Sequence, residues 1–199
     1  MVTEYNSKPV VRQLLRERLA AMNEASRHEK SQAACSLLIG CPEFAAAEVV
    51  MLYLSMPSEV DTAPLALRCW QQGKTVVVPS VSWHQRRILP VEINTLQSGL
   101  STTEHGVREP VGGNPIPVDL INLVVVPGLA FTGQGHRLGR GMGFYDRFLS
   151  QADFMGLSCG LAFEEQIVDS IPVLDHDISL GMLVTDRSVR RFAPELIRS

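Results

Sequence analysis

Residues 124–149 read VVVPGLAFTGQGHRLGRGMGFYDRFL, a pattern that predicts a buried strand, a glycine-rich loop and an apolar helix in succession. The strand is expected over residues 120–126 and the helix over residues 143–150. Between them lie two arginines, Arg137 and Arg140, and glycines at positions 128, 133, 135, 139, 141 and 143. Glycine lets successive backbone amides point at one anion, and the first turn of a helix adds partial positive charge. The segment therefore predicts a phosphate site at the end of a strand.

Strands and helices alternate along the rest of the chain. One helix is expected to begin at Pro9, and a second at Ser26, where Glu29 completes a capping box. A third is expected to follow Thr62 and to end at Gly73. Strands are expected over residues 49–54, 75–78, 88–93, 157–162 and 181–185. This order predicts an α/β fold of three layers, in which helices cover both faces of a mostly parallel sheet. Ligands bind such sheets at the carboxyl ends of the strands, where the glycine-rich loop begins.

Length and composition are typical of a globular protein. The chain has 199 residues, of which 45% are hydrophobic and 20% charged, and we expect residues 1–199 to form a single domain. Residues 97–118 are rich in Gly, Pro, Ser and Thr, and we expect a long ordered loop or lid there rather than a linker. The net charge of −3 argues against broad binding of nucleic acid, so no nucleic-acid partner is expected.

The cysteines and the first apolar residues predict the environment of the protein. The four cysteines are Cys35, Cys41, Cys69 and Cys159. They include no CxxC pair, which predicts buried free thiols in a reducing compartment. Arg12, Arg16 and Arg18 interrupt the first apolar residues, so no signal peptide is expected, and no run approaches the roughly 20 apolar residues of a membrane span. We therefore expect a cytoplasmic protein without a membrane partner. We also expect it to be a monomer.

The glycine-rich loop matches neither of the common nucleotide-binding signatures. A Walker loop requires a glycine, four further residues and then Gly-Lys-Ser/Thr, and this complete pattern is absent. A dinucleotide fingerprint that starts at Gly133 requires a glycine at position 138, where the chain has Leu138. Lys8 and Arg12 lie at the start of the first expected helix, and both can reach an anion near its amino end.

Several of these residues also have an interpretation without function. Asp146 can be a first-turn helix residue that the helix dipole stabilises, and Glu59 can cap the third helix. The Asp-His-Asp triplet at 175–177 is expected to be a turn with solvated charge, because no other histidine has ligand spacing. Trp70 and Trp83 are expected in the core or in a pocket wall rather than as a platform on which a ligand stacks. The loop arginines can pair with surface carboxylates, although their place among six glycines favours a ligand.

The pattern RLGRGMGFYDRFL, residues 137–149, is very similar to the signature RLGRGxGYYDRxL of the 5-formyltetrahydrofolate cyclo-ligases. The preceding VVPGLAF resembles the same family, as does the spacing of Lys8 and Arg12 before a Leu-rich helix. Further resemblances are LSMPSEVDT at 54–62, GVREP at 106–110 and LAFEEQIVDSIPVLDHD at 161–177. The short elements carry weight because they occur in the family's order.

Members of that family have an α/β fold and use MgATP to close 5-formyltetrahydrofolate into 5,10-methenyltetrahydrofolate, with release of ADP and phosphate. The resemblance implies the same reaction here, through phosphorylation of the formyl oxygen, with Mg²⁺ as cofactor and ATP as co-substrate. The number of glutamates on the folate stays open.

The resemblance also implies roles for individual residues. The implied ATP-binding residues are Lys8, Arg12, Arg137, Leu138, Gly139, Arg140, Gly141, Met142, Gly143, Phe144 and Tyr145. The implied folate-binding residues are Leu54, Met56, Glu59, Arg140, Gly141, Met142, Gly143 and Phe144. Arg137, Arg140 and Tyr145 are the implied catalytic residues, and Asp146 and Asp177 are the implied Mg²⁺ ligands, whose hard oxygens suit this ion.

The chain departs from the family pattern at three positions. Met142 stands where some relatives have Lys or Gly, Phe144 replaces the first Tyr, and Thr132 replaces a common Asp. The first change removes a phosphate contact, and the second removes a hydroxyl group. Two other functions stay open: a binding protein for RNA or a nucleotide on the same scaffold, and a sugar- or acyl-processing enzyme that works without ATP.

Overall fold

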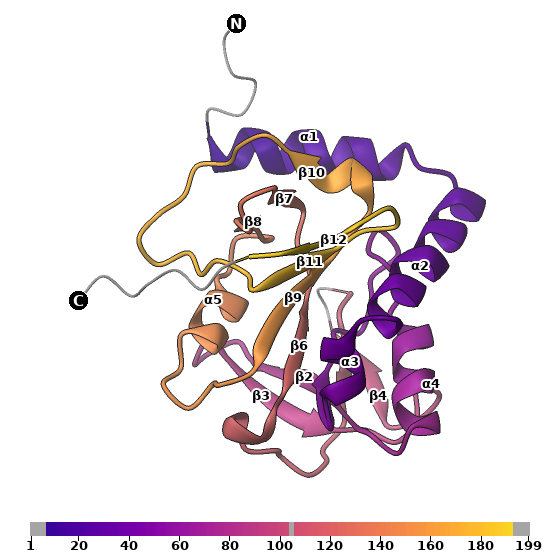
Figure 1. Cartoon of the computed structure of the whole chain (residues 1–199). Helices are drawn as coiled ribbons and strands as arrows, with labels where there is room; N and C mark the ends of the chain where they lie inside the picture. The colour runs from indigo at the N-terminus through magenta and orange to yellow at the C-terminus, as the bar shows by residue number, and fades with distance from the viewer. Residues whose placement is uncertain (1–6, 104–105, 193–199) are drawn as a thin grey trace, which may run out of the picture.

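The computed structural model describes residues 7–103 and 106–192 and confirms the predicted α/β architecture around a mostly parallel sheet (Figure 1). The seven strands of the main sheet are β1 (Val49–Met51), β2 (Thr75–Ser82), β3 (Arg87–Glu92), β6 (Leu123–Val126), β9 (Leu157–Leu161), β11 (Met182–Val184) and β12 (Val189–Arg191). Their order is β12-β11-β9-β6-β1-β2-β3. The five inner strands are parallel, and only the two edge strands, β12 and β3, run antiparallel to their neighbours.

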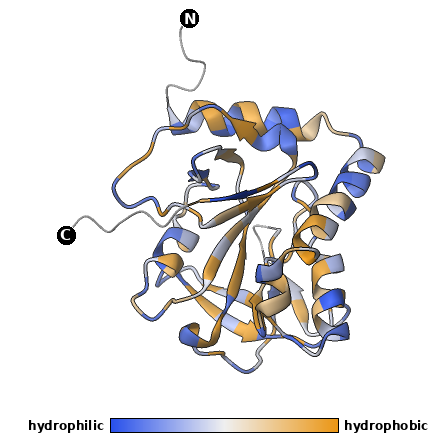
Figure 2. Ribbon diagram, viewed as in Figure 1, coloured by the Kyte–Doolittle hydropathy of each residue, from blue (hydrophilic) through white to orange (hydrophobic). Residues whose placement is uncertain are grey.

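Helices cover both faces of this sheet, as the sequence predicts. They are α1 (Lys8–Ala20), α2 (Glu24–Ile39), α3 (Pro42–Ala46), α4 (Ala63–Gln71) and α5 (Phe144–Leu149), with 3-10 turns η1 (Val118–Leu120) and η2 (Glu164–Gln166). Side chains of α1 to α4 pack into one core with Leu123 and Val125 of β6. Phe148 of α5 packs on the opposite face with Val124 and Val126. A strand buried on both faces explains the uninterrupted apolar run in β6 (Figure 2).

Two smaller sheets complete the fold. β7 (Ala130–Thr132) pairs with β8 (Arg137–Leu138) and with β10 (Ile167–Val168), so part of the predicted glycine-rich loop is a short hairpin. β4 (Leu100–Thr102) and β5 (Arg108–Pro110) pair within the segment predicted as a long loop or lid. The sequence did not predict these strands, α3 or β12. Each has only two to five residues, too few for a periodic pattern, and none lies in an apolar run as long as the one that indicated the equally short β1.

The predicted helix starts need correction. α1 begins at Lys8 itself, one residue before Pro9. α2 begins at Glu24, because the side chain of Asn23 accepts a hydrogen bond from the Ser26 amide, so the predicted start at Ser26 is wrong. Thr62 precedes α4 as predicted, but its hydroxyl donates to the carbonyl of Tyr53 and does not cap the helix.

The predicted strand ends also differ. β1 ends at Met51 rather than residue 54, and β6 begins at Leu123 because η1 occupies residues 118–120. β2 runs through Pro79 to Ser82, since β3 pairs with it from Val77 opposite Glu92 to Ser82 opposite Arg87. None of the helices in residues 7–103 and 106–192 has the length and apolar character that crossing a membrane requires.

Candidate active site

A cleft of about 870 Å³ opens at the carboxyl ends of β1, β2 and β6, where the topology of a parallel sheet places ligand sites. Leu54 follows β1, Val81 lies near the end of β2, and Pro127 and Gly128 follow β6. The start of α1 and the turn at residues 174–178 close one end of the cleft. Every site residue that the sequence indicated, from Lys8 through the 137–146 segment to Asp177, lines this cleft.

The glycine-rich loop brings arginines of distant elements together. Arg12 of α1 donates from Nε to the carbonyl of Gly139 at 2.9 Å. Gly141 has a φ of 116°, which is costly for any residue with a Cβ. A Cβ at this position would lie 3.5 Å from the Arg12 guanidinium carbon. The turn therefore requires glycine at 141, whereas the approach of Arg12 does not, because 3.5 Å is an ordinary van der Waals contact.

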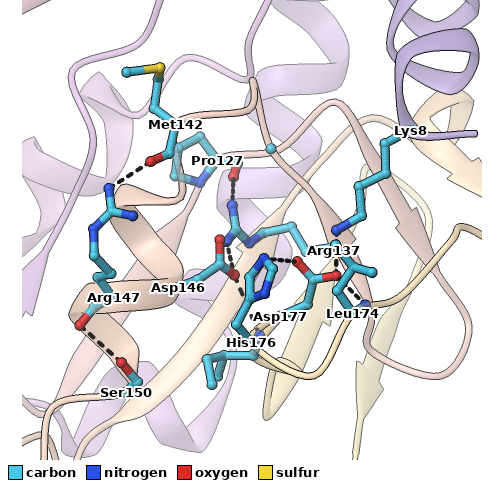
Figure 3. A network of polar contacts seen from close by, with 12 residues as sticks. Lys8, Pro127, Arg137, Met142, Asp146, Arg147, Ser150, Leu174, His176 and Asp177 are labelled. Atoms are coloured by element: carbon cyan, nitrogen blue, oxygen red, sulfur yellow. Dashed lines mark hydrogen bonds and ion pairs between the residues drawn. The ribbon is translucent and has the colours of Figure 1, made fainter. Parts of the chain in front are cut away.

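Arg137 and Asp146 form a buried ion pair beside the loop (Figure 3). Arg137 Nη2 lies 2.8 Å from Asp146 Oδ1, and the arginine side chain is only 4% exposed. A second guanidinium nitrogen donates to the carbonyl of Pro127 at 3.4 Å. The same Oδ1 of Asp146 accepts from the amide of Ile178 at 3.4 Å. The pair thus joins β8, α5 and the 174–178 turn.

Lys8 and Asp177 form a second ion pair at the end of the cleft near α1. Lys8 Nζ lies 2.5 Å from Asp177 Oδ2, which also accepts from the Leu174 amide at 2.7 Å (Figure 3). Partial burial opposes ionisation of Asp177, but the hydrogen bonds from Lys8 and Leu174 outweigh it and lower the pKa of this carboxyl group. The contact fastens the start of α1 to the 174–178 turn.

The lowered pKa of Asp177 predicts a pH-dependent part of stability. A carboxylate whose pKa is lower in the folded state contributes stability above its unfolded pKa, about 3.9, and loses it as the pH falls through the folded value. Urea unfolding of Asp177→Asn and the unmutated protein should therefore differ by a constant free energy above about pH 5, and the difference should shrink below about pH 4. A difference independent of pH from 6 to about 3 would contradict this role.

Arg140 reaches across the mouth of the cleft to Glu59. Its Nη2 lies 3.0 Å from Glu59 Oε1, and the arginine side chain is 39% exposed. Glu59 Oε2 accepts from the amide of Met56 at 3.0 Å, so the carboxylate also orders the loop after β1. Arg140, which the resemblance implies for ATP and folate, and Glu59, which it implies for folate, are therefore in contact with each other in this structure.

The other end of the cleft is aromatic. The rings of Trp83 and Phe144 meet edge to face with centroids 5.2 Å apart. The hydroxyl of Tyr145 is buried without a hydrogen-bond partner among the described residues, and burial raises the pKa of this phenol. An unpartnered buried hydroxyl is an unusual cost in a native protein, and it marks a position where a ligand could supply the missing bond.

Several cleft residues were not among the sequence-derived candidates. They are Tyr53, Val81, Arg86, Val107, Arg108 and Arg147, whereas Trp83 lines the cleft in one of its two expected places, a pocket wall. Arg147 lies inside the quoted 124–149 segment, and this position was the signal in the sequence that could have identified it as a cleft residue. Trp83 and Arg86 lie in the turn between β2 and β3, and no local pattern reveals that this turn contacts α5.

The cleft carries an excess of positive charge. Its basic side chains are Lys8, Arg12, Arg86, Arg108, Arg137, Arg140 and Arg147, and its acidic ones are Glu59, Asp146, Asp175 and Asp177. This excess of three positive charges lies in a chain whose net charge is −3. Such a local field favours a ligand with several negative charges.

The two predicted metal ligands, Asp146 and Asp177, lie in segments that contact each other, but they are not part of a larger group of ligand side chains among the described residues. Asp146 contacts the amide of Ile178, the residue after Asp177. Within residues 7–103 and 106–192, no three or more His, Cys, Asp or Glu side chains are grouped so that they could hold a metal ion. Two carboxylates alone suit Mg²⁺ only where a ligand's phosphates add oxygens, so the metal role stays a prediction.

The parallel sheet, and the basic, glycine-lined cleft at the carboxyl ends of its strands, define an α/β protein built to bind an anionic ligand. Comparison with known proteins narrows this class. The sequence profile of the 5-formyltetrahydrofolate cyclo-ligase family matches residues 4–186. The chain belongs to the 5-formyltetrahydrofolate cyclo-ligase family, and it is an enzyme.

Individual relatives agree with this assignment. The chain is 30% identical to the 5-formyltetrahydrofolate cyclo-ligase of Escherichia coli K12, with 88% of this chain and 98% of the relative covered. It is 27% identical to that of Mus musculus, with 94% and 97% covered. The solved 5,10-methenyltetrahydrofolate synthetase of Aquifex aeolicus superposes with a TM-score of 0.80 at 31% identity, over 92% of each chain.

Proposed function

We propose that this protein uses ATP and Mg²⁺ to cyclise 5-formyltetrahydrofolate to 5,10-methenyltetrahydrofolate, with release of ADP and phosphate. The observation that carries the proposal is one continuous cleft with two different ends. Lys8, Arg12, Arg137 and Arg140 lie around the bare glycine backbone at one end. At the other end the rings of Trp83 and Phe144 meet beside Arg86 and Arg147. A polyphosphate and a flat heterocycle fit these two ends, and the family supplies the names of the substrates.

The reaction needs a better leaving group than a formamide offers. In the proposed first step, the formyl oxygen attacks the γ-phosphorus of ATP, and the bond to the β–γ bridging oxygen breaks to release ADP. The neighbouring folate nitrogen then attacks the formyl carbon and gives up its proton to the departing phosphate, and the C–O bond breaks to release that phosphate. Phosphoryl transfer depends on positioning and on neutralising charge rather than on a protein nucleophile. The protein therefore needs no catalytic Ser or Cys.

The phosphate end of the cleft is assigned to residues around the glycine-rich loop. Lys8 and Arg12 would hold the ATP phosphates, because both line the cleft, Arg12 bonded to the carbonyl of Gly139 in the loop and Lys8 paired with Asp177. The side chain of Arg140 is 39% exposed, whereas that of Arg137 is 4% exposed. Arg140 is therefore better able to turn toward a transferring phosphoryl group. Arg137, held by Asp146 and Pro127, would act from its fixed place beside the loop.

Asp146 and Asp177 fit a Mg²⁺ ion by the chemistry of their donors. Each gives one carboxylate oxygen to the hydrogen bonds described above, Oδ1 of Asp146 and Oδ2 of Asp177. Each therefore has a second hard oxygen for a cation. Mg²⁺, when bound, would neutralise negative charge on the phosphates during transfer.

The folate end is assigned to the loop after β1 and to the aromatic side of the cleft. Glu59 can accept hydrogen bonds from the N–H groups of a pterin, once Arg140 no longer occupies it. Leu54 and Met56 would contact the flat faces of the ring. The buried hydroxyl of Tyr145 has no partner among the described residues and could bond a substrate atom.

The direct test is the appearance of the methenyl product, which is followed by its absorbance. We expect product only when 5-formyltetrahydrofolate, ATP and Mg²⁺ are all present, with one ADP formed for each methenyl group. Lys8→Ala should raise the KM for ATP by about tenfold or more, since it removes a charge-assisted contact. The matched control Arg68→Ala removes an exposed charge on α4 outside the cleft and should leave both constants unchanged.

Other outcomes would support the other functions. Product without ATP would contradict the phosphoryl-transfer step and favour an enzyme that works without a nucleotide. A folded protein that binds RNA or nucleotide but never forms the methenyl product would favour a binding role. In either case the proposed function would be wrong.

A further inference from the structure

Arg147 contacts three parts of the aromatic end of the cleft at once. Its Nε donates to the carbonyl of Arg86 at 2.8 Å, and its Nη2 donates to the carbonyl of Met142 at 2.6 Å. Its guanidinium carbon lies 5.5 Å from the ring centroid of Phe144. Figure 3 shows the bond that runs from Arg147 to Met142 along the start of α5. One side chain therefore joins the β2–β3 turn to the glycine-rich loop.

The backbone on both sides is shaped to receive this side chain. Gly143 has a φ of 64°, and a Cβ there would lie 3.0 Å from Arg147 Nη1. On the other side, Arg86 has a φ of 51°, the only positive φ of a non-glycine residue in the described chain. This uncommon conformation occurs in the residue whose carbonyl accepts the bond from Arg147. Glycine at 143 leaves room, and the turn presents its carbonyl.

The β2–β3 turn and α5, the helix that contains Arg147, each contribute one ring to the aromatic end. Trp83 comes from the β2–β3 turn and Phe144 from the first residue of α5, and their rings meet at close to a right angle, 88°. The sequence separation between these residues is large, so local structure alone does not set their relative position. Arg147 links the two segments, because it donates to the backbone of the β2–β3 turn and to that of the glycine-rich loop just before α5.

We propose that Arg147 is a positioning residue that holds Trp83 and Phe144 together as the wall against which the flat ring of the folate packs. This rests on the proposed function for the identity of the ring, but the arrangement of the wall does not depend on it. Arg147 does not touch the reacting atoms in this proposal. It determines affinity for the folate and leaves the phosphoryl-transfer step unchanged.

The first part of the test follows the wall itself. In protein labelled with 5-fluorotryptophan, the ¹⁹F NMR spectrum should contain separate signals for Trp70 and Trp83, assigned by their loss in Trp70→Phe and Trp83→Phe. Arg147→Ala should shift or broaden the Trp83 signal and leave that of Trp70 in place. The control Arg87→Ala removes the exposed neighbour of Arg86 and should change neither signal. An unchanged Trp83 signal in folded Arg147→Ala would overturn the proposal.

The second part measures ligand affinity apart from turnover. In Arg147→Ala, the Kd of 5-formyltetrahydrofolate from equilibrium titration should rise about tenfold, whereas KM for ATP and kcat should change less than about threefold. Arg147→Lys should recover only part of the affinity, because one ammonium group cannot reproduce two fixed N–H donors in a plane. Equal losses in folate affinity, ATP KM and kcat would indicate general damage and overturn the proposal.

The two proposals fail in different ways. If the unmutated protein binds 5-formyltetrahydrofolate but forms no methenyl product, the proposed function is wrong, while a tenfold weaker Kd in Arg147→Ala still supports the positioning role. If the Trp83 signal moves but folate affinity does not, the wall exists but does not bind the ring, and the inference is wrong even for an active enzyme.

Discussion

Arg140→Ala should lower kcat by about two to three orders of magnitude while leaving the midpoint of thermal unfolding nearly unchanged. Removing one preorganised donor that stabilises developing charge typically has an effect of this size. The contribution of Arg140 to stability is expected to be about 1 kcal/mol, because its side chain is 39% exposed and Glu59, which is 11% exposed, keeps the hydrogen bond from the Met56 amide. The measurement is kcat by methenyl absorbance beside a thermal melt.

Two controls sharpen this result. Arg68→Ala, on the exposed side of α4, should change neither quantity. Glu59→Gln removes the charge that pairs with Arg140 but keeps Arg140, so it should weaken folate affinity more than it lowers kcat. A variant Arg140→Ala that loses turnover and stability in equal measure would show that the residue maintains the fold rather than the reaction.

Arg137→Ala should lower the free energy of unfolding by about 3 kcal/mol, the low end of what breaking a buried ion pair costs. The low end applies because Asp146 remains 18% exposed, so water can solvate part of the carboxylate that is left without its partner. The change would also leave the carbonyl of Pro127 without its donor. Urea denaturation with a constant slope is the appropriate measurement.

A double-mutant cycle separates the pair from other losses. Arg137→Ala combined with Asp146→Asn should cost clearly less than the two single changes together, because the neutral asparagine no longer leaves a buried charge unpaired. Strictly additive effects, or a loss below about 1 kcal/mol for Arg137→Ala, would contradict a stabilising role of the pair.

The sheet and the position of the cleft could be predicted from the sequence because their signals are local and repeated. The apolar run at 123–126 has no polar position, which indicates a strand covered on both faces, and helical patterns separate it from the other strands. The loop after it contains glycines whose backbone angles confirm the need for this residue, as at Gly141. Position at the end of a parallel strand then predicted the site.

The predictions of helix starts and strand ends that were wrong, and the contacts that were missed, depend on packing between segments that the local sequence does not show. Asn23 and Ser26 are both good capping residues, and the sequence alone does not show which side chain reaches an unpaired amide. Pro79 reads as a strand end, yet β3 pairs beyond it. The pairing of Arg140 with Glu59 and the contact of Arg147 with Arg86 join residues more than sixty positions apart, so no spacing rule could reveal them.

The ion pairs Lys8–Asp177, Arg137–Asp146 and Arg140–Glu59 have a consequence for selectivity. Each cation already has an anionic neighbour supplied by the protein, so a single small ion such as chloride or sulfate gains little by replacing one carboxylate. A chain of linked phosphates can replace several neighbours in one binding event, and each replacement makes the next one easier because the ligand is already held. The protein without ligand should therefore bind small anions weakly and bind a nucleotide with several negative charges more tightly.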